Sequence, residues 1–447
     1  MKSSKKFLAA AMSGVLLCSG AAFPIANAAV DSVTMTATIA LNGDSIAVEG
    51  DNVAVEGTIV TISASGSYEI SGTLNDGQIR VSVPDETVDP GTVKLYFNGA
   101  SITGVSEAPL YIVNAENTSL NLVEGTENFL NDGPVYTETN AVIYAKDDIT
   151  IKGDGALTIT ALTQHGVHCN NDLKINGGEI RVDTEMEDAL RGKTSVEING
   201  GFLNINAEGD GIKSTQGDVL ITGGETEVKA GNDAVQGETS LVISGGELMA
   251  NGDRGLTCAT AAVTISGGVV LATATDNQCA SVTAEQPVML LNFAEECVKD
   301  QKLVIYGKTA ADADLQLLSM KPDKKFSFAL VSIPEFTADG VYDLTLADAY
   351  LTHAAAKTDH DFTMTDALTA FDSVLVTDSK VPSILMGDVN VDGIIKIDDA
   401  VMLARYVGED DSLVIPDGGA ERMDMNKDHI VDASDTIQIL RYLAGLS

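Results

Sequence analysis

Short segments in which apolar and polar residues alternate run through the middle of the chain, and two adjacent glycines stand between successive segments. Residues 195–198 (Ser-Val-Glu-Ile) precede one such glycine pair, and residues 202–206 (Phe-Leu-Asn-Ile-Asn) follow it. Alternation with a period of two predicts β-strands, because successive side chains of a strand point to opposite faces. A helical period of 3.6 persists nowhere in this region.

The glycine pairs recur at a nearly constant interval. Their first members are 23, 23, 22 and 22 residues apart, and Gly155 lies 22 residues before the first pair. This period, with short strands, predicts a parallel β-helix with one turn per repeat. We expect each pair to form a corner, because glycine bends without a Cβ clash. The pairs are Gly177-Gly178, Gly200-Gly201, Gly223-Gly224, Gly245-Gly246 and Gly267-Gly268.

The predicted fold is therefore mostly β, with a right-handed parallel β-helix over residues 29–285. The repeat is lost near residue 286, and Lys302–Tyr306 and Val341–Leu346 are expected to be antiparallel strands of a small β cap or appended β-unit over residues 286–380. Inward stacks are expected from among six apolar residues, some of which must point outward. These are Val196, Ile198, Leu220, Ile221, Val242 and Ile243.

The first 28 residues have the features of a secretion signal. Basic lysines precede an apolar stretch from Phe7 to Leu17, and Ala26-Asn27-Ala28 forms an A-x-A cleavage site. No other apolar run is long enough to span a bilayer. The sequence thus predicts an extracellular protein without membrane insertion, and four cysteines would remain after cleavage: Cys169, Cys258, Cys279 and Cys297.

The charge balance is strongly acidic. With 27 Lys and Arg against 65 Asp and Glu, the formal net charge is −38, and it becomes −41 (24 − 65) when the three lysines of the signal are removed. Such a charge excludes nucleic acid as a natural partner. The chain has no Trp and few aromatic residues, so a flat aromatic platform for crystalline cellulose is poorly supported.

Two twelve-residue loops in the last sixty residues carry oxygen ligands at positions 1, 3, 5 and 12 and a backbone carbonyl at position 7. This is the ligand set of a Ca²⁺ loop. The loops start 36 residues apart (424 − 388), and each precedes a short apolar-periodic helix. The predicted ligands are Asp388, Asn390, Asp392, Ile394 and Asp399 in the first loop, and Asp424, Asn426, Asp428, Ile430 and Asp435 in the second.

Residues 384–447 resemble the dockerin module of cellulosomal proteins, a double F-hand. The resemblance implies that this tail binds Ca²⁺ and docks onto a cohesin of a scaffoldin; the alternative is a calcium-binding tail without a partner. His429 stands where Gly normally makes the turn. The matching residues are Gly387–Gly393, Ile395, Asp399, Leu403–Tyr406, Asp424–Asp428, Val431, Asp435 and Leu440–Leu443. The expected partner-binding residues are Ile397, Asp398, Arg405, Ala433, Ser434 and Arg441.

The middle of the chain resembles secreted bacterial carbohydrate-binding domains with a polysaccharide-lyase-like β-helix. The resemblance rests on Gly66–Leu74, Val123–Asn128, Asp148–Gly155 and the glycine repeat. It implies binding of a plant cell-wall polysaccharide, either acidic and pectin-like or cellulosic, together with calcium. The resemblance does not by itself imply catalysis.

Acidic residues follow the repeat, and Asp188, Asp210 and Asp233 share the most similar contexts, with Asp253 and Asp276 further on. Stacked one turn apart, at about 4.8 Å, such carboxylates repel one another unless a cation lies between them. Two interpretations stay open: the carboxylates share Ca²⁺ between turns, or aspartate is simply a good turn residue.

Three residues after this column comes a second one, formed by His168, Arg191, Lys213 and Gln236. If calcium and a cation flank one groove, Arg191 or Lys213 is a candidate base for β-elimination on a uronate polymer. Alternatively, both cations pair with the acidic column or bind sugar carboxylates. The predicted function is polysaccharide binding in a cellulosome. The first alternative is a calcium-dependent polysaccharide lyase or other polysaccharide-degrading enzyme. A further alternative is a purely structural surface protein.

Overall fold

The structure is a computed structural model of the chain. It describes residues 33–105, 107–134, 139–275, 282–299, 302–308, 314–336, 341–347, 356–357, 362–363, 374–376, 387, 389–390, 395–408, 410, 412–416, 419–423, 425 and 431–444. The predicted signal peptide therefore lies outside the described residues. None of the described helices has the length and hydropathy of a membrane span.

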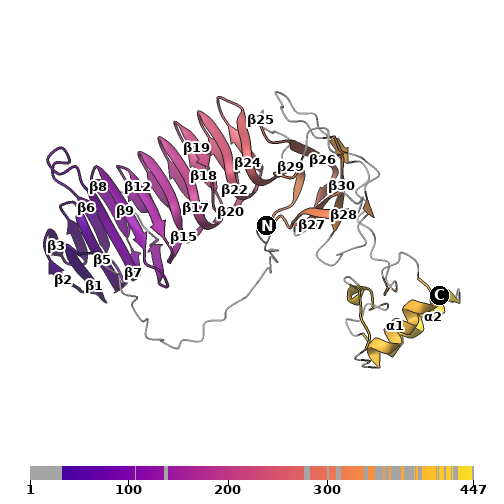
Figure 1. Cartoon of the computed structure of the whole chain (residues 1–447). Helices are drawn as coiled ribbons and strands as arrows, with labels where there is room; N and C mark the ends of the chain where they lie inside the picture. Colours follow the sequence, from indigo (N-terminus) through magenta and orange to yellow (C-terminus); the bar gives the residue numbers. More distant parts are fainter. Residues whose placement is uncertain are drawn as a thin grey trace, which may run out of the picture.

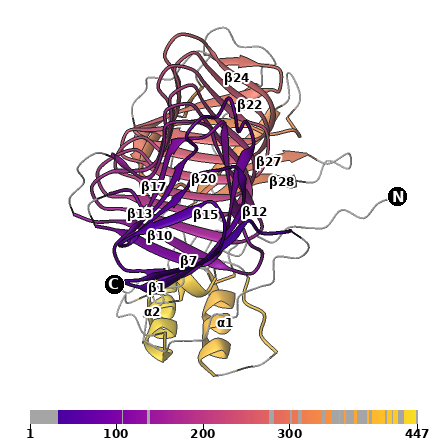
Figure 2. The same ribbon diagram turned by 90° about the vertical axis from the view of Figure 1, so that its left-hand side faces the viewer.

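A parallel β-helix forms the main body, as the glycine repeat predicts (Figure 1). Seen from its first strands, the turns lie behind one another (Figure 2). One wall is a ten-stranded sheet in which β3 pairs antiparallel with β4, and the strands from β4 to β23 run parallel, one per turn. Its strands are β3 Val53–Glu56, β4 Ile59–Ile62, β6 Gln78–Ser82, β8 Leu110–Asn114, β11 Ala141–Ala145, β14 His165–Cys169, β16 Leu190–Gly192, β18 Ile212–Ser214, β21 Asp233–Gly237 and β23 Arg254–Cys258.

An eighteen-stranded sheet wraps round the rest of the coil and continues into the cap. Its strands are β1 Ala37–Gly43, β2 Ile46–Gly50, β5 Gly66–Leu74, β7 Thr92–Gly104, β9 Asn117–Leu122, β10 Glu127–Asp132, β12 Ile149–Gly153, β13 Ala156–Ala161, β15 Asp172–Thr184, β17 Ser195–Ala207, β19 Asp218–Ile221, β20 Glu225–Ala230, β22 Ser240–Gly252, β24 Val263–Ala274, β25 Val282–Ala284, β26 Val288–Cys297, β29 Phe326–Ser332 and β33 Val374–Val376.

The glycine pairs are corners, and the corner residue is the second glycine of each pair. Gly178, Gly201, Gly224, Gly246 and Gly268 all have positive φ, between 80° and 97°. A Cβ on Gly201 would lie 2.7 Å from the carbonyl oxygen of Gly178 in the preceding turn. A side chain at this position is therefore excluded both by backbone conformation and by the close stacking of turns.

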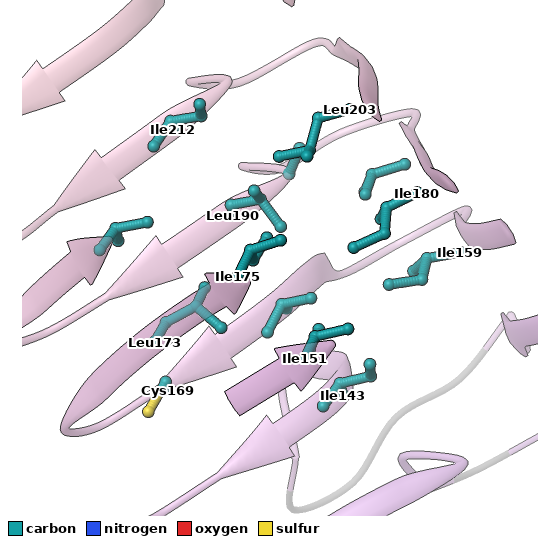
Figure 3. Packing of buried hydrophobic residues seen from close by; sticks show 14 of the residues in the cluster. Ile143, Ile151, Ile159, Cys169, Leu173, Ile175, Ile180, Leu190, Leu203 and Ile212 are labelled. Carbon is teal, nitrogen blue, oxygen red and sulfur yellow. The ribbon is translucent and has the colours of Figure 1, made fainter. Parts of the chain in front are cut away.

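The core is a set of aliphatic stacks that run along the coil axis (Figure 3). One stack places an isoleucine of each turn on the isoleucine of the next, and all six are buried: Ile151, Ile175, Ile198, Ile221, Ile243 and Ile265. Val196 also points inward, whereas Leu220 and Val242 are only half-buried on the outer face. Burial of continuous stacks lets turns that have no core of their own form one fold.

Both ends of the coil are covered. At the first end, β1 pairs antiparallel with β2 and parallel with β5, so a hairpin closes the sheet. At the other end, β29 pairs antiparallel with β24 and β26. A second apolar cluster packs Met249, Val269 and Leu271 against the cap. Capping removes the unpaired edges that an open coil would present.

The cap also contains a five-stranded sheet: β27 Lys302–Lys308, β28 Asp314–Met320, β30 Val341–Ala347, β31 Ala356–Lys357 and β32 Phe362–Thr363. β27 and β30 pair antiparallel, as the sequence predicts. The last part of the chain forms α1 Ile397–Val407, a 3-10 turn η1 Ala420–Arg422 and α2 Ala433–Leu443. Cys169, Cys258 and Cys297 are free thiols; Cys279 lies outside the described residues.

Candidate functional site

One row of side chains faces outward along the ten-stranded sheet, and we call it the outer column. Strand register aligns one residue of each turn, so that each side chain stacks on the corresponding side chain of the next turn. At about 4.8 Å per turn, the column is a continuous strip. Its members are Arg80, Tyr111, Tyr144, His168, Arg191, Lys213, Gln236 and Thr257.

Local alternation aims these side chains outward. Tyr111 stands between the buried Leu110 and Ile112, and His168 stands between the buried Val167 and Cys169. Because neighbours in a strand point to opposite faces, burying the flanking aliphatic residues turns the central residue toward solvent. The structure thus places His168, Arg191, Lys213 and Gln236 in one column, as their spacing predicts.

The first part of the outer column is aromatic. The rings of Tyr111 and Tyr144 have centroids 5.5 Å apart, and those of Tyr144 and His168 are 5.4 Å apart in an edge-to-face arrangement. The Asn170 side-chain amide donates to the Tyr144 hydroxyl at 3.1 Å, and Nδ1 of His168 lies 2.7 Å from Oδ1 of Asn140. Rings held in this way form a preorganised apolar surface with polar edges.

Beside the outer column runs a second column, formed by His165, Asp188, Asp210, Asp233 and Arg254, which we call the acidic column. Its first three side chains each accept a backbone N–H from the next turn: the N–H of Asp188 donates to Nδ1 of His165 at 3.0 Å, that of Asp210 to Oδ1 of Asp188 at 2.9 Å, and that of Asp233 to Oδ1 of Asp210 at 3.0 Å. Asp253, expected in this column, lies one residue before Arg254, which is the residue in register with Asp233.

A cation accompanies every aspartate of the acidic column. Arg191 Nη1 lies 3.0 Å from Oδ2 of Asp188, and the ammonium of Lys213 contacts Oδ2 of Asp210. Arg254 forms a bidentate pair with Asp233, at 2.6 and 2.7 Å. The three carboxylates are 6%, 4% and 1% exposed, so these ion pairs, with the backbone hydrogen bonds, satisfy charges that would be costly to leave alone.

The histidines at the aromatic end are held neutral. Burial, together with the neighbouring His165 and Arg191, lowers the pKa of His168 to about 4, against the opposing charge of Asp188. Burial also lowers the pKa of His165, whose Nδ1 must be unprotonated to accept the Asp188 N–H. In contrast, burial raises the pKa of Asp233, against the opposing effects of Thr257 and Arg254.

These contacts bear on the calcium and lyase interpretations. The repulsion between Asp188, Asp210 and Asp233 that motivates a shared Ca²⁺ is relieved by Arg191, Lys213 and Arg254. Within the described ranges, no group of three His, Cys, Asp or Glu residues is arranged to hold a metal ion. Arg191 and Lys213 are engaged by carboxylates, which is the alternative that the sequence left open. Calcium on this column stays a prediction.

In the tail, the last residue of each loop is also the third residue of the helix that follows. Asp399 is fully buried, and its carboxylate accepts N–H groups from Asn390 at 2.9 Å and Lys396 at 2.8 Å. Asp435 is equally buried and accepts the N–H of Asp432 at 3.0 Å. Both carboxylates therefore tie the loop to its helix. The other predicted ligands lie outside the described residues: Asp388, Asp392, Ile394, Asp424, Asp428, Asn426 and Ile430.

The predicted partner-binding residues are all exposed: Ile397, Asp398, Arg405, Ala433, Ser434 and Arg441. Apolar side chains lie beside them, with Ile397 and Val401 exposed on α1 and Ile437 and Leu440 exposed on α2. Arg405 pairs with Asp410 at 2.8 Å. The helices pack on each other through the small core of Leu403, Met423 and Ile439. The exposed residues take no part in this core.

Comparison with known proteins finds a family match in each of two parts of the chain. A family model described as "Carbohydrate-binding domain-containing protein" matches residues 56–295, more than half of the chain. The chain belongs to this family. A model of the dockerin type I domain matches residues 386–444. This chain thus joins a carbohydrate-binding domain to a dockerin type I domain, as the sequence predicts.

A relative within the family comes from Acetivibrio thermocellus, where it is named "Carbohydrate-binding domain-containing protein". It is 42% identical over 130 residues, which span 28% of this chain and 44% of the relative. A solved structure of the "polysaccharide lyase-like protein from C. thermocellum" is 35% identical and covers 52% of this chain and 95% of its own, with a TM-score of 0.44. The chain therefore spans less than half of the length of the Acetivibrio thermocellus relative.

Sequence reasoning missed the aromatic half of the outer column. Arg80, Tyr111 and Tyr144 precede the glycine repeat, and their spacings of 31 (111 − 80) and 33 (144 − 111) residues do not match its period. A local signal was present, because Ile143-Tyr144-Ala145 repeats the pattern of an outward residue between two inward ones. Matching strands by this pattern instead of by interval would have found them.

Proposed function

We propose that this protein holds a plant cell-wall polysaccharide along the outer column and attaches it to a cellulosome through its dockerin. The observation that carries the proposal is the register of Tyr111, Tyr144 and His168, which places three half-buried rings in successive turns on the outer face of one sheet, tilted or edge-to-face. The C–H faces of a pyranose are apolar, and its hydroxyls are polar, so an aromatic surface with amide edges suits it. The rise of the coil per turn, about 4.8 Å, is close to the length of one sugar unit along a polysaccharide chain.

The dockerin half of the proposal is attachment to a cohesin in the presence of Ca²⁺. The match to the dockerin type I domain and the buried Asp399 and Asp435 support it. Calcium would be held by the two loops, with Asp399 and Asp435 as their last ligands. The exposed faces of α1 and α2 would meet the cohesin, and the predicted signal of residues 1–28 would direct secretion. Circular dichroism of the protein with a chelator should show loss of helix.

The test of polysaccharide binding compares two tyrosines of the same coil. Tyr144→Ala removes the middle ring of the outer column, whereas Tyr96→Ala removes a half-buried outward tyrosine from β7 in the other sheet. Retention of the full chain on insoluble pectin and cellulose should fall about five- to tenfold for Tyr144→Ala only. Equal retention of both variants would overturn the proposed surface.

The lyase alternative is tested in the same incubations. β-Elimination on polygalacturonate gives an unsaturated product that absorbs in the ultraviolet. Because Asp188 and Asp210 engage Arg191 and Lys213, we expect no such product. A steady rise in absorbance that is lost in Lys213→Ala would make the protein an enzyme instead.

A further inference from the structure

Arg80 differs from the other arginines of the coil. Arg181 pairs with Asp183 at 2.6 Å, and Arg191 and Arg254 pair with aspartates of the acidic column. Arg80 donates instead from Nε to the neutral side chain of Gln78, at 2.9 Å. Among the residues that the structure describes, it forms no ion pair, although the protein carries 65 acidic residues.

The position of this guanidinium is built into the core. Gln78 is 1% exposed, and its amide nitrogen donates to the carbonyl oxygen of Ala108 at 2.9 Å, so its oxygen is fixed toward Arg80. The anchored Nε leaves the two Nη groups as the fork that recognises carboxylates in a bidentate manner. A neutral anchor orients the cation without neutralising it.

A second cation lies at the same ring. Arg80 Cζ is 5.8 Å and Lys146 Nζ is 5.5 Å from the centroid of Tyr111. Each cation is attracted electrostatically by the quadrupole of the ring, but two like charges near one ring also repel each other. Arg80 comes from the turn before Tyr111 and Lys146 from the turn after it, so the two cations make this end of the outer column positive. No such gathering of cations is needed to bind a neutral glucan.

We infer that Arg80, Tyr111 and Lys146 form a subsite for the carboxylate of a uronic acid residue, which makes the ligand an acidic polysaccharide. The inference rests on the proposed function, because it assumes that the sugar chain lies on the outer column. The Nη groups of Arg80 receive the carboxylate, the positive charge of Lys146 one turn beyond Tyr111 favours an anionic chain, and the pyranose lies on Tyr111 and Tyr144. The next turns, where Arg191 and Lys213 are already paired, then contact hydroxyl groups.

The experiment measures binding of the full chain, by calorimetry, to polygalacturonate oligomers and to the same oligomers fully methyl-esterified. Wild type should prefer the acid form. Arg80→Met keeps the alkyl stem but removes the charge, and it should lower affinity for the acid form about tenfold while changing affinity for the ester less than twofold. Arg181→Met, which breaks an ion pair on another wall, should change neither. Arg80→Lys should lose part of the preference.

The outcomes separate the two proposals. Loss of both affinities in Arg80→Met with an unchanged thermal midpoint, or no loss of either, would overturn the carboxylate subsite. A wild type that binds the ester as tightly as the acid would do the same and leave polysaccharide binding intact. A wild type that binds neither oligomer, with Tyr144→Ala indistinguishable from Tyr96→Ala, would overturn the proposed function itself.

Discussion

The two halves of the outer column occupy equivalent places in the coil but differ in how their chemistry is satisfied. In the later turns, Arg191 and Lys213 meet buried aspartates of their own chain. In the earlier turns, Ala141 and His165 stand where the later turns have an aspartate, and the outward residues are tyrosines, a histidine and Arg80. A cation that is paired internally stabilises the fold, whereas one held by a neutral anchor is available to a ligand.

The largest expected effect tests the structural role of the later half. Asp233→Ala should lower the free energy of unfolding by about 2–3 kcal/mol, because it removes the bidentate partner of Arg254 and the shorter hydrogen bond of the Thr257 hydroxyl. Asp183→Ala, which removes the exposed pair with Arg181, should cost less than about 1 kcal/mol. Chemical denaturation measures both. Equal losses would mean that burial does not distinguish the two pairs.

The second effect concerns pH at the junction of the halves. The pKa of His168, about 4, lies below its usual 6.5, so the fold favours the neutral ring. Stability from this residue should be complete above pH 6.5 and decline as the pH falls toward 4, by roughly 1–2 kcal/mol because the ring is partly solvated. The measurement is the difference in unfolding free energy between wild type and His168→Gln across this range. A difference that stays constant with pH would contradict the prediction.

A third change should make the later half resemble the earlier one. Asp188→Asn keeps an oxygen to accept the Asp210 N–H but removes the charge that engages Arg191. Affinity for polygalacturonate should rise about two- to fivefold, while affinity for the methyl ester should stay unchanged. Calorimetry checks it. If affinity for the acid form does not rise, pairing is not what separates the halves.

The smallest expected effect distinguishes ion pairs from calcium in the acidic column. If Arg191, Lys213 and Arg254 are sufficient to neutralise it, a chelator should leave the melting of the coil unchanged, within about 1 °C, while the helical signal of α1 and α2 falls. Far-ultraviolet circular dichroism at two wavelengths follows both signals in one sample. A clear drop in the melting temperature of the coil would favour a shared Ca²⁺ between the turns.

Much of the architecture could be predicted because the repeat is local. The glycine corners, the strand alternation and the inward Ile198 and Ile221 all follow from spacing and period, and the structure confirms them. Assigning Leu220 and Val242 was ambiguous, since an apolar residue beside a buried one carries no sign of its direction. The two loops of the tail were found in the same way, because their ligands lie within twelve residues.

The candidate site divides along the same line. The sequence by itself determined the turn, the corner, the inward stack and the later part of the outer column, because residues 22 or 23 apart in a regular repeat must stack. Only the tertiary structure decided that Tyr111, Tyr144 and Arg80 join this column, and that Arg254, not Asp253, closes the acidic one. Loops of unequal length separate the early turns, and hydrogen bonding between strands sets their register independently of that length.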